Sequence, residues 1–222
     1  PTGMVYTREE MEAIAGIVKK HEGLYILSDE IYEHIIFKGE HVSMASFDFV
    51  YDKVITVNGV SKSYAMTGWR VGYIGAPLWI VKACDKLQGQ FTSGVCTIAQ
   101  KAALAALTVK DNSRQLMRDA FLRRRDLICK LLKDIRGFRV RIPQGAFYVM
   151  PDISWYLGKS DGGKNIRTSD DLALWLLDKA QVAVVGGDAF GAPKCIRISY
   201  ATSDELLVEA VKRMKAALER LR

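Results

Sequence analysis

Cysteine, histidine and long apolar runs are all scarce in this 222-residue sequence, and each scarcity excludes a class of protein. The 4 cysteines are scattered and form no CxxC pair, which argues against a disulfide scaffold or a zinc site. The 3 histidines show no HExxH spacing, so we expect no metal site. Apolar runs stay far below the roughly 20 residues that a membrane span needs, so we expect no transmembrane segment.

A low-complexity tract is also missing, and the positive charge is not gathered into a patch. With 49% hydrophobic residues the chain can bury a core, and we expect order nearly from end to end. The net charge of +7 raises the possibility of a nucleic-acid partner. The densest basic run, Arg123 to Arg125, lies in a helix-patterned stretch beside Asp119 and Asp126, without interleaved aromatics. A solvated helix face explains this pattern better, so we expect no nucleic-acid partner.

The first residues lack a start methionine, and they lack the basic and apolar regions of a signal peptide. We therefore expect an N-terminally truncated chain, and a cytoplasmic protein.

The first half of the chain alternates between a helical pattern and short apolar runs. Residues 7–22 carry Thr7 with Glu10 three positions later, which predicts a capped amphipathic helix. Short apolar runs at 24–28, 53–57 and 71–76 have strand length. This alternation predicts an α/β fold with a mostly parallel sheet.

The second half begins with two predicted helices, at 95–108 and 112–134. After Gly137 come short strands (FRVRI, AFYVM), a polar insertion at 158–167, a helix from near Thr168, the strands VAVV and CIRISY, and a last helix from Ser203. We predict two parts, namely residues 1–112 in a large domain and residues 113–222 as a long connecting helix followed by a small α+β domain.

Lys62 lies in a Ser-Lys-Ser loop directly after a predicted buried strand. In open α/β sheets, ligands bind beyond the carboxyl ends of the strands, so this amine is placed where a ligand would lie. Apolar neighbours disfavour a charged ammonium, and an uncharged amine can form an imine. The alternative is an ordinary surface lysine.

Asp29 and Tyr32 follow another predicted strand, in the motif SDEIY. At the same sheet edge as Lys62, a carboxylate could hold a proton on a ring nitrogen, and a phenol could donate to a ring oxygen. The alternative is that Asp29 and Glu30 only cap or solvate the end of the strand.

Two arginines stand out as candidate anion-binding residues. Arg70 follows Lys62 closely, and its guanidinium fork suits a phosphate, with Ser61 and Ser63 as further donors. Arg197 interrupts the apolar strand CIRISY, and a buried guanidinium needs an anionic partner. A substrate carboxylate fits this requirement, and an internal Asp or Glu would also satisfy it.

These pieces, in this order, resemble the C-terminal portion of a class I aminotransferase of the aspartate aminotransferase group, within the fold-type I pyridoxal-phosphate enzymes. The resemblance runs along nearly the whole chain and rests on six motifs: PTG at 1–3, SDEIY, SKSYAMTGWRVGY, PQGAFYVMPDIS, VAVVGGDAFG and CIRISYAT. It implies a large, mostly parallel-sheet domain that binds pyridoxal 5'-phosphate, followed by a smaller α+β domain.

The resemblance also implies roles for individual residues. Lys62 would form the Schiff base with pyridoxal 5'-phosphate and later act as general base. Asp29 would pair with the ring nitrogen, and Tyr32 would bind the phenolic oxygen of the ring. Arg70 and Ser61 would bind the phosphate.

By the same resemblance, Arg197 would bind the α-carboxylate of the substrate, and the reaction would move an amino group from an L-amino acid, with aspartate first, to a 2-oxo acid such as 2-oxoglutarate. Homodimerisation is implied too. A chain without the upstream half of the family would be inactive by itself. A C–S lyase or decarboxylase of the same fold, and a non-catalytic regulatory module, are the alternatives.

Overall fold

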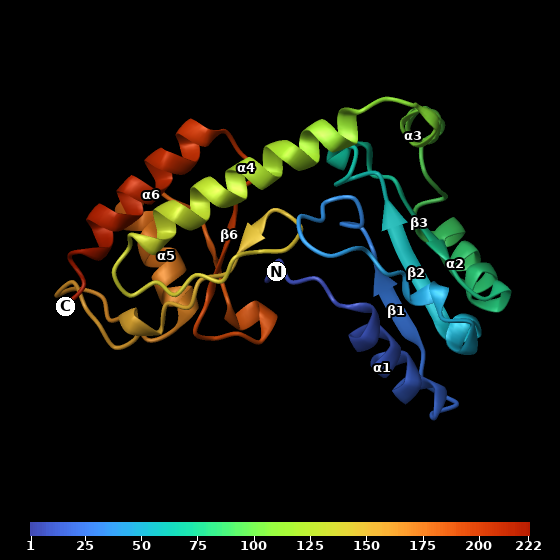
Figure 1. The fold of residues 1–222 in the computed structure, drawn as a ribbon, viewed down its shortest axis with the longest axis horizontal. Helices are drawn as coiled ribbons and strands as arrows, with labels where there is room; N and C mark the ends of the chain where they lie inside the picture. The colour runs from blue at the N-terminus through green and yellow to red at the C-terminus, as the bar shows by residue number, and fades with distance from the viewer. The chain divides into compact units, whose positions relative to one another are not determined.

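The computed structural model describes all residues from 1 to 222 and divides into two compact units. The N-terminal unit comprises Val5–Leu116, and the C-terminal unit comprises Pro1–Met4 with Met117–Arg222. Figure 1 shows the path of the chain through both. The expected α/β class is confirmed; the N-terminal sheet contains both parallel and antiparallel pairs, and the C-terminal sheet is antiparallel.

The N-terminal unit is built on a three-stranded sheet in the order β1-β2-β3. β1 and β2 are parallel and pair Asp29 with Val57, whereas β2 and β3 are antiparallel. The elements of this unit are β1 (Ile26–Asp29), β2 (Val54–Gly59), β3 (Gly72–Gly75), α1 (Arg8–Lys19), α2 (Leu78–Phe91) and α3 (Thr97–Thr108).

The start of α1 follows from its sequence. The Thr7 hydroxyl accepts from the Glu10 amide at 3.2 Å, and the Glu10 carboxylate accepts from the Thr7 amide at 2.8 Å. This reciprocal pair satisfies two amides that the first turn of a helix leaves without partners. The predicted capped helix is confirmed, and Ala15 on its buried side packs into a small core with Val50 and Val54.

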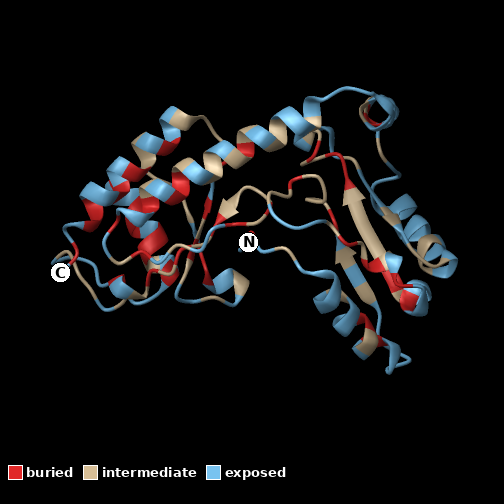
Figure 2. Cartoon of the chain, in the orientation of Figure 1, coloured by how far each residue is buried: buried red, intermediate tan, exposed pale blue.

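The C-terminal unit has an antiparallel sheet in the order β4-β6-β5. The long helix α4 begins in the N-terminal unit and continues into this one. The elements are α4 (Ser113–Lys133), β4 (Tyr148–Val149), α5 (Ser169–Ala180), β5 (Val185–Gly186), β6 (Ile196–Ser199) and α6 (Asp204–Leu218). Figure 2 shows buried residues on α4, α5 and α6.

Both predicted helix starts in this unit are confirmed. Thr168 and Asp171 form a second capping box at the start of α5. The Ser203 hydroxyl accepts from the Leu206 amide at 3.3 Å at the start of α6. Short polar side chains at these positions therefore determine where the helices begin.

The short strands were predicted less well. FRVRI forms no strand, and Arg139 makes only an isolated bridge to Asp152. AFYVM contributes only Tyr148–Val149, and VAVV contributes only its last residue, to Val185–Gly186. A strand needs a paired neighbour, and alternation of side chains along one segment does not show how many residues will be paired.

The first residues of the chain dock onto a later loop of the same unit. The Gly3 carbonyl accepts from the amides of Gln144 and Gly145, at 2.6 and 3.0 Å. Gly3 has a φ of +72°, and a Cβ atom there would lie 2.5 Å from the Pro143 Cβ. Only glycine fits at this distance and with this φ. The PTG motif therefore packs against the PQG motif through the backbone of Gly3. Across the chain, no helix combines the length and apolarity needed to cross a membrane.

Candidate active-site residues

The structure brings Asp29 and Lys62 to the same edge of the N-terminal sheet. β1 and β2 run parallel, Asp29 ends β1, and Lys62 lies in the turn that follows β2. Lys62 is half-buried, whereas Asp29 is exposed, and one Asp29 oxygen accepts from the Ile31 amide at 3.3 Å. Tyr32 is half-buried in the turn after β1. These three predicted residues therefore share one region, beyond the carboxyl ends of two parallel strands.

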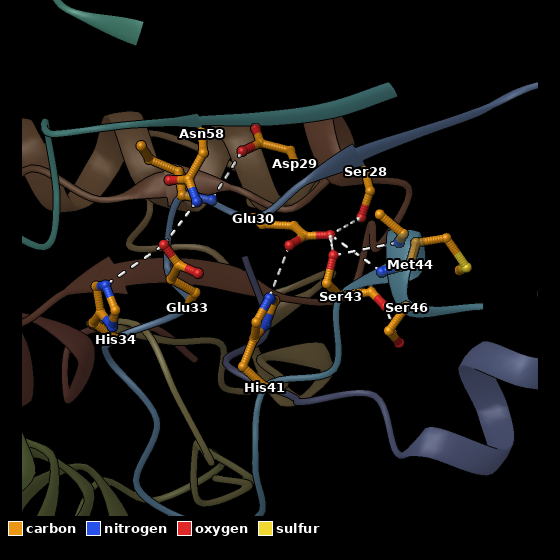
Figure 3. Close-up of polar contacts among 12 residues, drawn as sticks. Ser28, Asp29, Glu30, Glu33, His34, His41, Ser43, Met44, Ser46 and Asn58 are labelled. Carbon is orange, nitrogen blue, oxygen red and sulfur yellow. Dashed lines mark hydrogen bonds and ion pairs between the residues drawn. The ribbon is translucent and has the colours of Figure 1, made fainter. Parts of the chain in front are cut away.

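Glu30, the neighbour of Asp29, points to the opposite side of the strand, as the alternation of side chains requires (Figure 3). Glu30 as a whole residue is only 7% exposed. One oxygen accepts from the Ser28 and Ser43 hydroxyls, at 3.0 and 2.9 Å, and from the Met44 amide at 3.2 Å. The other oxygen lies 2.9 Å from His41 Nε2. Three of these partners, His41, Ser43 and Met44, thus hold the end of β1 against the segment around residues 41–44, and the fourth, Ser28, lies on β1 itself.

The two ionisable groups of this cluster shift each other's titration. Burial by itself would raise the pKa of Glu30, but hydrogen bonds from His41, Ser43 and Ser28 outweigh it, and the pKa lies below its usual value. The hydrogen bond to Glu30 raises the pKa of His41 against the opposing effect of burial. Both shifts favour an anionic Glu30 beside a cationic His41.

A second polar group fixes the end of β2. The Asn58 amide nitrogen donates to Glu33 at 2.7 Å, and the Asn58 oxygen accepts from the Gly59 amide at 2.7 Å (Figure 3). His34 Nε2 lies 3.1 Å from Arg114 Nη1. Burial lowers the pKa of His34, and Arg114 lowers it further.

Glu30, Glu33 and His41 place potential metal-ligand atoms within 4.8 Å of one another, although no metal site was expected. The Glu30 oxygens already accept hydrogen bonds from Ser28, Ser43, Met44 and His41. We assign no metal to this group.

The loop that carries Lys62 contains the other predicted cofactor residues. Ser61 is half-buried. Ser63 is only 2% exposed, and its hydroxyl has no hydrogen-bond partner. Arg70 is exposed, has a left-handed φ of 54°, and donates from Nη1 to the Thr67 carbonyl at 2.9 Å. That bond uses one of the five N–H donors of the Arg70 guanidinium, and the other four do not take part in it.

Arg197 lies in the other unit, on β6, between the buried residues Ile196 and Ile198. Its side chain is half-buried and makes no ion pair with any Asp or Glu of this chain. Its guanidinium carbon is 4.5 Å from the ring centre of Tyr148 and 4.6 Å from that of Phe190. The internal Asp or Glu partner that the sequence left open is therefore not present within ion-pair distance.

Several of these neighbours were missed by the sequence analysis. Glu30 was considered only as a capping or solvating residue, and strand alternation could have placed it on the buried side. Tyr148 and Phe190 are separated from Arg197 in sequence, and only sheet pairing brings Tyr148 near it. No local signal marks them.

Comparison with known proteins identifies the family. The description "Aminotransferase class I and II" matches residues 1–214. A bifunctional aspartate aminotransferase and glutamate/aspartate-prephenate aminotransferase of Petunia hybrida is 50% identical over 98% of this chain and 47% of its own length. An aspartate/prephenate aminotransferase of Cereibacter sphaeroides is 44% identical over 97% of this chain and 55% of its own length.

Solved structures agree with these sequence relatives. The aspartate aminotransferase of Rhizobium meliloti superposes with a TM-score of 0.94 at 40% identity, over 100% of this chain and 56% of that one. The Thermus thermophilus aspartate aminotransferase with maleate gives 0.87 at 40% identity, over 98% and 54%. The chain belongs to the class I and II aminotransferase family, and it spans about half the length of these relatives.

Proposed function

We propose that this chain carries the cofactor lysine and the carboxylate-binding arginine of a pyridoxal-phosphate-dependent aminotransferase. The observation that carries the proposal is the placement of Lys62 and Asp29 beyond the carboxyl ends of the parallel strands β1 and β2. An amine and a carboxylate at one sheet edge are the two groups that a protein needs to hold an aldehyde cofactor with a basic ring nitrogen.

The residues of the N-terminal unit fit pyridoxal 5'-phosphate. The buried hydroxyl of Ser63, next to Lys62, lacks a partner, and the exposed fork of Arg70 keeps donors for a phosphate. In this proposal Lys62 bonds the cofactor covalently, Asp29 meets the ring nitrogen and Tyr32 meets the ring oxygen. Ser61 and Arg70 take the phosphate.

When bound, pyridoxal phosphate supplies a sink for the electron pair released at the α-carbon of an amino acid. The protein groups do the rest. Asp29 keeps a proton on the ring nitrogen, and the Lys62 amine takes the proton from the α-carbon and returns it at the next position. The hydrogen bonds of Glu30 hold the strand end from which Asp29 projects.

Arg197 favours transamination over decarboxylation, because a carboxylate held by a guanidinium is a poor leaving group. Elimination of a side-chain substituent is less constrained by it, and a C–S lyase is the second candidate. From the names of similar proteins we propose an L-amino acid, with aspartate first, as amino donor and a 2-oxo acid such as 2-oxoglutarate as acceptor. A cytoplasmic homodimer belongs to the same proposal, as does the division into a cofactor domain (1–112) and a small domain (113–222).

Chemical trapping tests this proposal. The protein as its gene encodes it is mixed with pyridoxal phosphate, reduced with borohydride and digested, and the phosphopyridoxyl group is located by peptide mass spectrometry. We expect label concentrated at Lys62, and none at that position in Lys62→Arg, which keeps the charge but is not an imine-forming amine. Label scattered over surface lysines would contradict the assignment.

A further inference from the structure

We infer that Tyr148 and Phe190 form an aromatic slot that fixes the plane of the Arg197 guanidinium and thereby sets the affinity for substrate carboxylates. The inference rests on the proposed function of Arg197 as the carboxylate-binding residue and adds two positioning residues to it. Tyr148 and Phe190 act through Arg197 and need not touch the substrate.

The pairing of the strands explains how one ring reaches the guanidinium. Tyr148 pairs directly with Ser199, and residues opposite each other in an antiparallel pair point to the same face of the sheet. Ser199 and Arg197 are two positions apart on β6, so they also share that face. Tyr148 is therefore the diagonal neighbour of Arg197, at a separation that an aromatic and a long side chain can bridge.

The second ring comes from the other side of β6. β5 pairs Val185 with Arg197, and the chain then turns through a short 3-10 helix, Asp188–Phe190, at whose end Phe190 lies. Both rings have guanidinium-to-centroid distances near 4.5 Å, namely 4.5 Å for Tyr148 and 4.6 Å for Phe190. Two different connections of the small sheet thus bring aromatic rings to one cation.

The physical consequence concerns which atoms of Arg197 stay available. A guanidinium is flat, and its broad faces are weakly hydrated, so they stack well on aromatic rings. The negative ring faces stabilise the positive charge that no acid of this chain neutralises. The N–H donors lie at the edge of the plane, where a carboxylate can accept two of them in parallel.

The slot also reduces the freedom that a carboxylate would otherwise have to remove. An arginine side chain loses rotamer entropy when a ligand fixes it, and rings that hold the plane in advance lower that loss. Removal of either ring should therefore weaken carboxylate binding and leave the later chemistry at Lys62 nearly unchanged. A KM effect without a kcat effect is the expected signature.

The test uses the protein as its gene encodes it, loaded with pyridoxal phosphate, and two measurements. Steady-state kinetics with aspartate and 2-oxoglutarate give KM and kcat. Titration calorimetry with maleate, a dicarboxylate with no amino group to transfer, gives affinity without turnover. For Tyr148→Leu and for Phe190→Leu we expect KM for both substrates, and the maleate Kd, to rise about 3- to 30-fold, with kcat within about twofold.

Matched variants keep the ring. Tyr148→Phe and Phe190→Tyr should stay within about twofold of the wild type in KM and in maleate Kd. If the leucine variants fail to fold, Tyr148→His and Phe190→His, which keep a smaller flat ring, take their place, with intermediate losses expected. Borohydride labelling of Lys62 at the wild-type extent identifies variants that keep the cofactor site.

The outcomes separate the slot from the proposed function. Leucine variants that bind maleate as tightly as the wild type, while Arg197→Lys binds it at least tenfold more weakly, would overturn the slot and leave the function standing. A fall in kcat with unchanged KM would also overturn it. Failure of the wild type to label at Lys62 or to bind maleate would overturn the proposed function, and the slot with it.

Discussion

The two units differ in how far each covers its own apolar residues. The C-terminal unit buries large side chains almost completely, among them Trp175, Tyr200, Leu132 and Met214. In the N-terminal unit, α2 has no buried residue (Figure 2). Phe91 at its end is 83% exposed. The C-terminal unit therefore has an extensive core, whereas the smaller core of the N-terminal unit includes no residue of α2.

The two units also differ in net charge. The N-terminal unit has 12 Lys and Arg and 12 Asp and Glu, whereas the C-terminal unit has 20 and 13, so it carries the whole net charge of +7. Arg197 belongs to this positive unit. A positive field raises the local concentration of anions such as carboxylates. The C-terminal unit thus combines a well-buried core with a positive charge that attracts anions, whereas buried polar groups of the N-terminal unit lie at its strand ends.

The largest expected effect compares one tryptophan in each unit. Trp175 is 1% exposed and donates to Asp161 at 2.9 Å, whereas Trp79 on α2 is 61% exposed and meets only the edge of Tyr25 in a ring contact. Trp175→Ala should lower the free energy of unfolding by about 3–5 kcal/mol, and Trp79→Ala by about 1 kcal/mol or less. Hydrogen exchange resolved by peptide measures both, and equal losses would show that α2 is covered in solution.

A smaller effect is expected from Glu30, the buried carboxylate of the N-terminal unit. Glu30→Ala leaves the donors of Ser28, Ser43, Met44 and His41 without their acceptor, and we expect a loss of about 2–3 kcal/mol in stability. The matched control is the exposed Glu40, whose change to alanine should cost less than about 0.5 kcal/mol. Urea unfolding followed by circular dichroism compares the two variants. Similar losses in the free energy of unfolding would mean that the Glu30 cluster adds no stability.

The smallest effect is the pH dependence that the Glu30–His41 pair gives to the stability of the N-terminal unit. The raised pKa of His41 means that its contribution is complete below the unfolded value of 6.5 and is lost as the pH rises through the folded value. The lowered pKa of Glu30 makes its contribution complete above 4.5 and lost as the pH falls through the folded value. The pair should stabilise most between these limits.

His34 opposes this trend, because its lowered pKa removes stability as the pH falls below 6.5. The difference between the wild type and His41→Asn isolates the contribution of His41. We expect that difference to shrink as the pH rises from 6 to 9, measured by urea unfolding at each pH. A difference that stays constant with pH would contradict the charged pair.

The helices could be predicted closely, because their ends depend on local chemistry. The capping boxes at Thr7 and Thr168 place the starts of α1 and α5 from four residues each. The lengths of the short strands could not be predicted, because they depend on which segments pair. FRVRI has the alternation of a strand but finds only one isolated bridge, at Arg139.

The candidate site also has a part that the sequence predicts and a part that it does not. The sequence places Asp29 and Lys62 at strand ends, and the parallel pairing of β1 with β2 brings those ends together. Three of the four partners of Glu30 come from a segment more than ten residues later, and the rings around Arg197 come from two other segments. Such groupings depend on tertiary structure, and no periodicity along the sequence encodes them.

Transfer of a labelled amino group shows directly whether Lys62 carries out transamination. The protein as its gene encodes it, with pyridoxal phosphate, is given ¹⁵N-aspartate and 2-oxoglutarate, and the products are analysed by mass spectrometry. We expect ¹⁵N-glutamate from the wild type, at least a thousandfold less from Lys62→Ala, and a raised KM from the leucine variants of the Arg197 slot. Equal formation of ¹⁵N-glutamate by the wild type and Lys62→Ala, or none by the wild type, would contradict this role of Lys62.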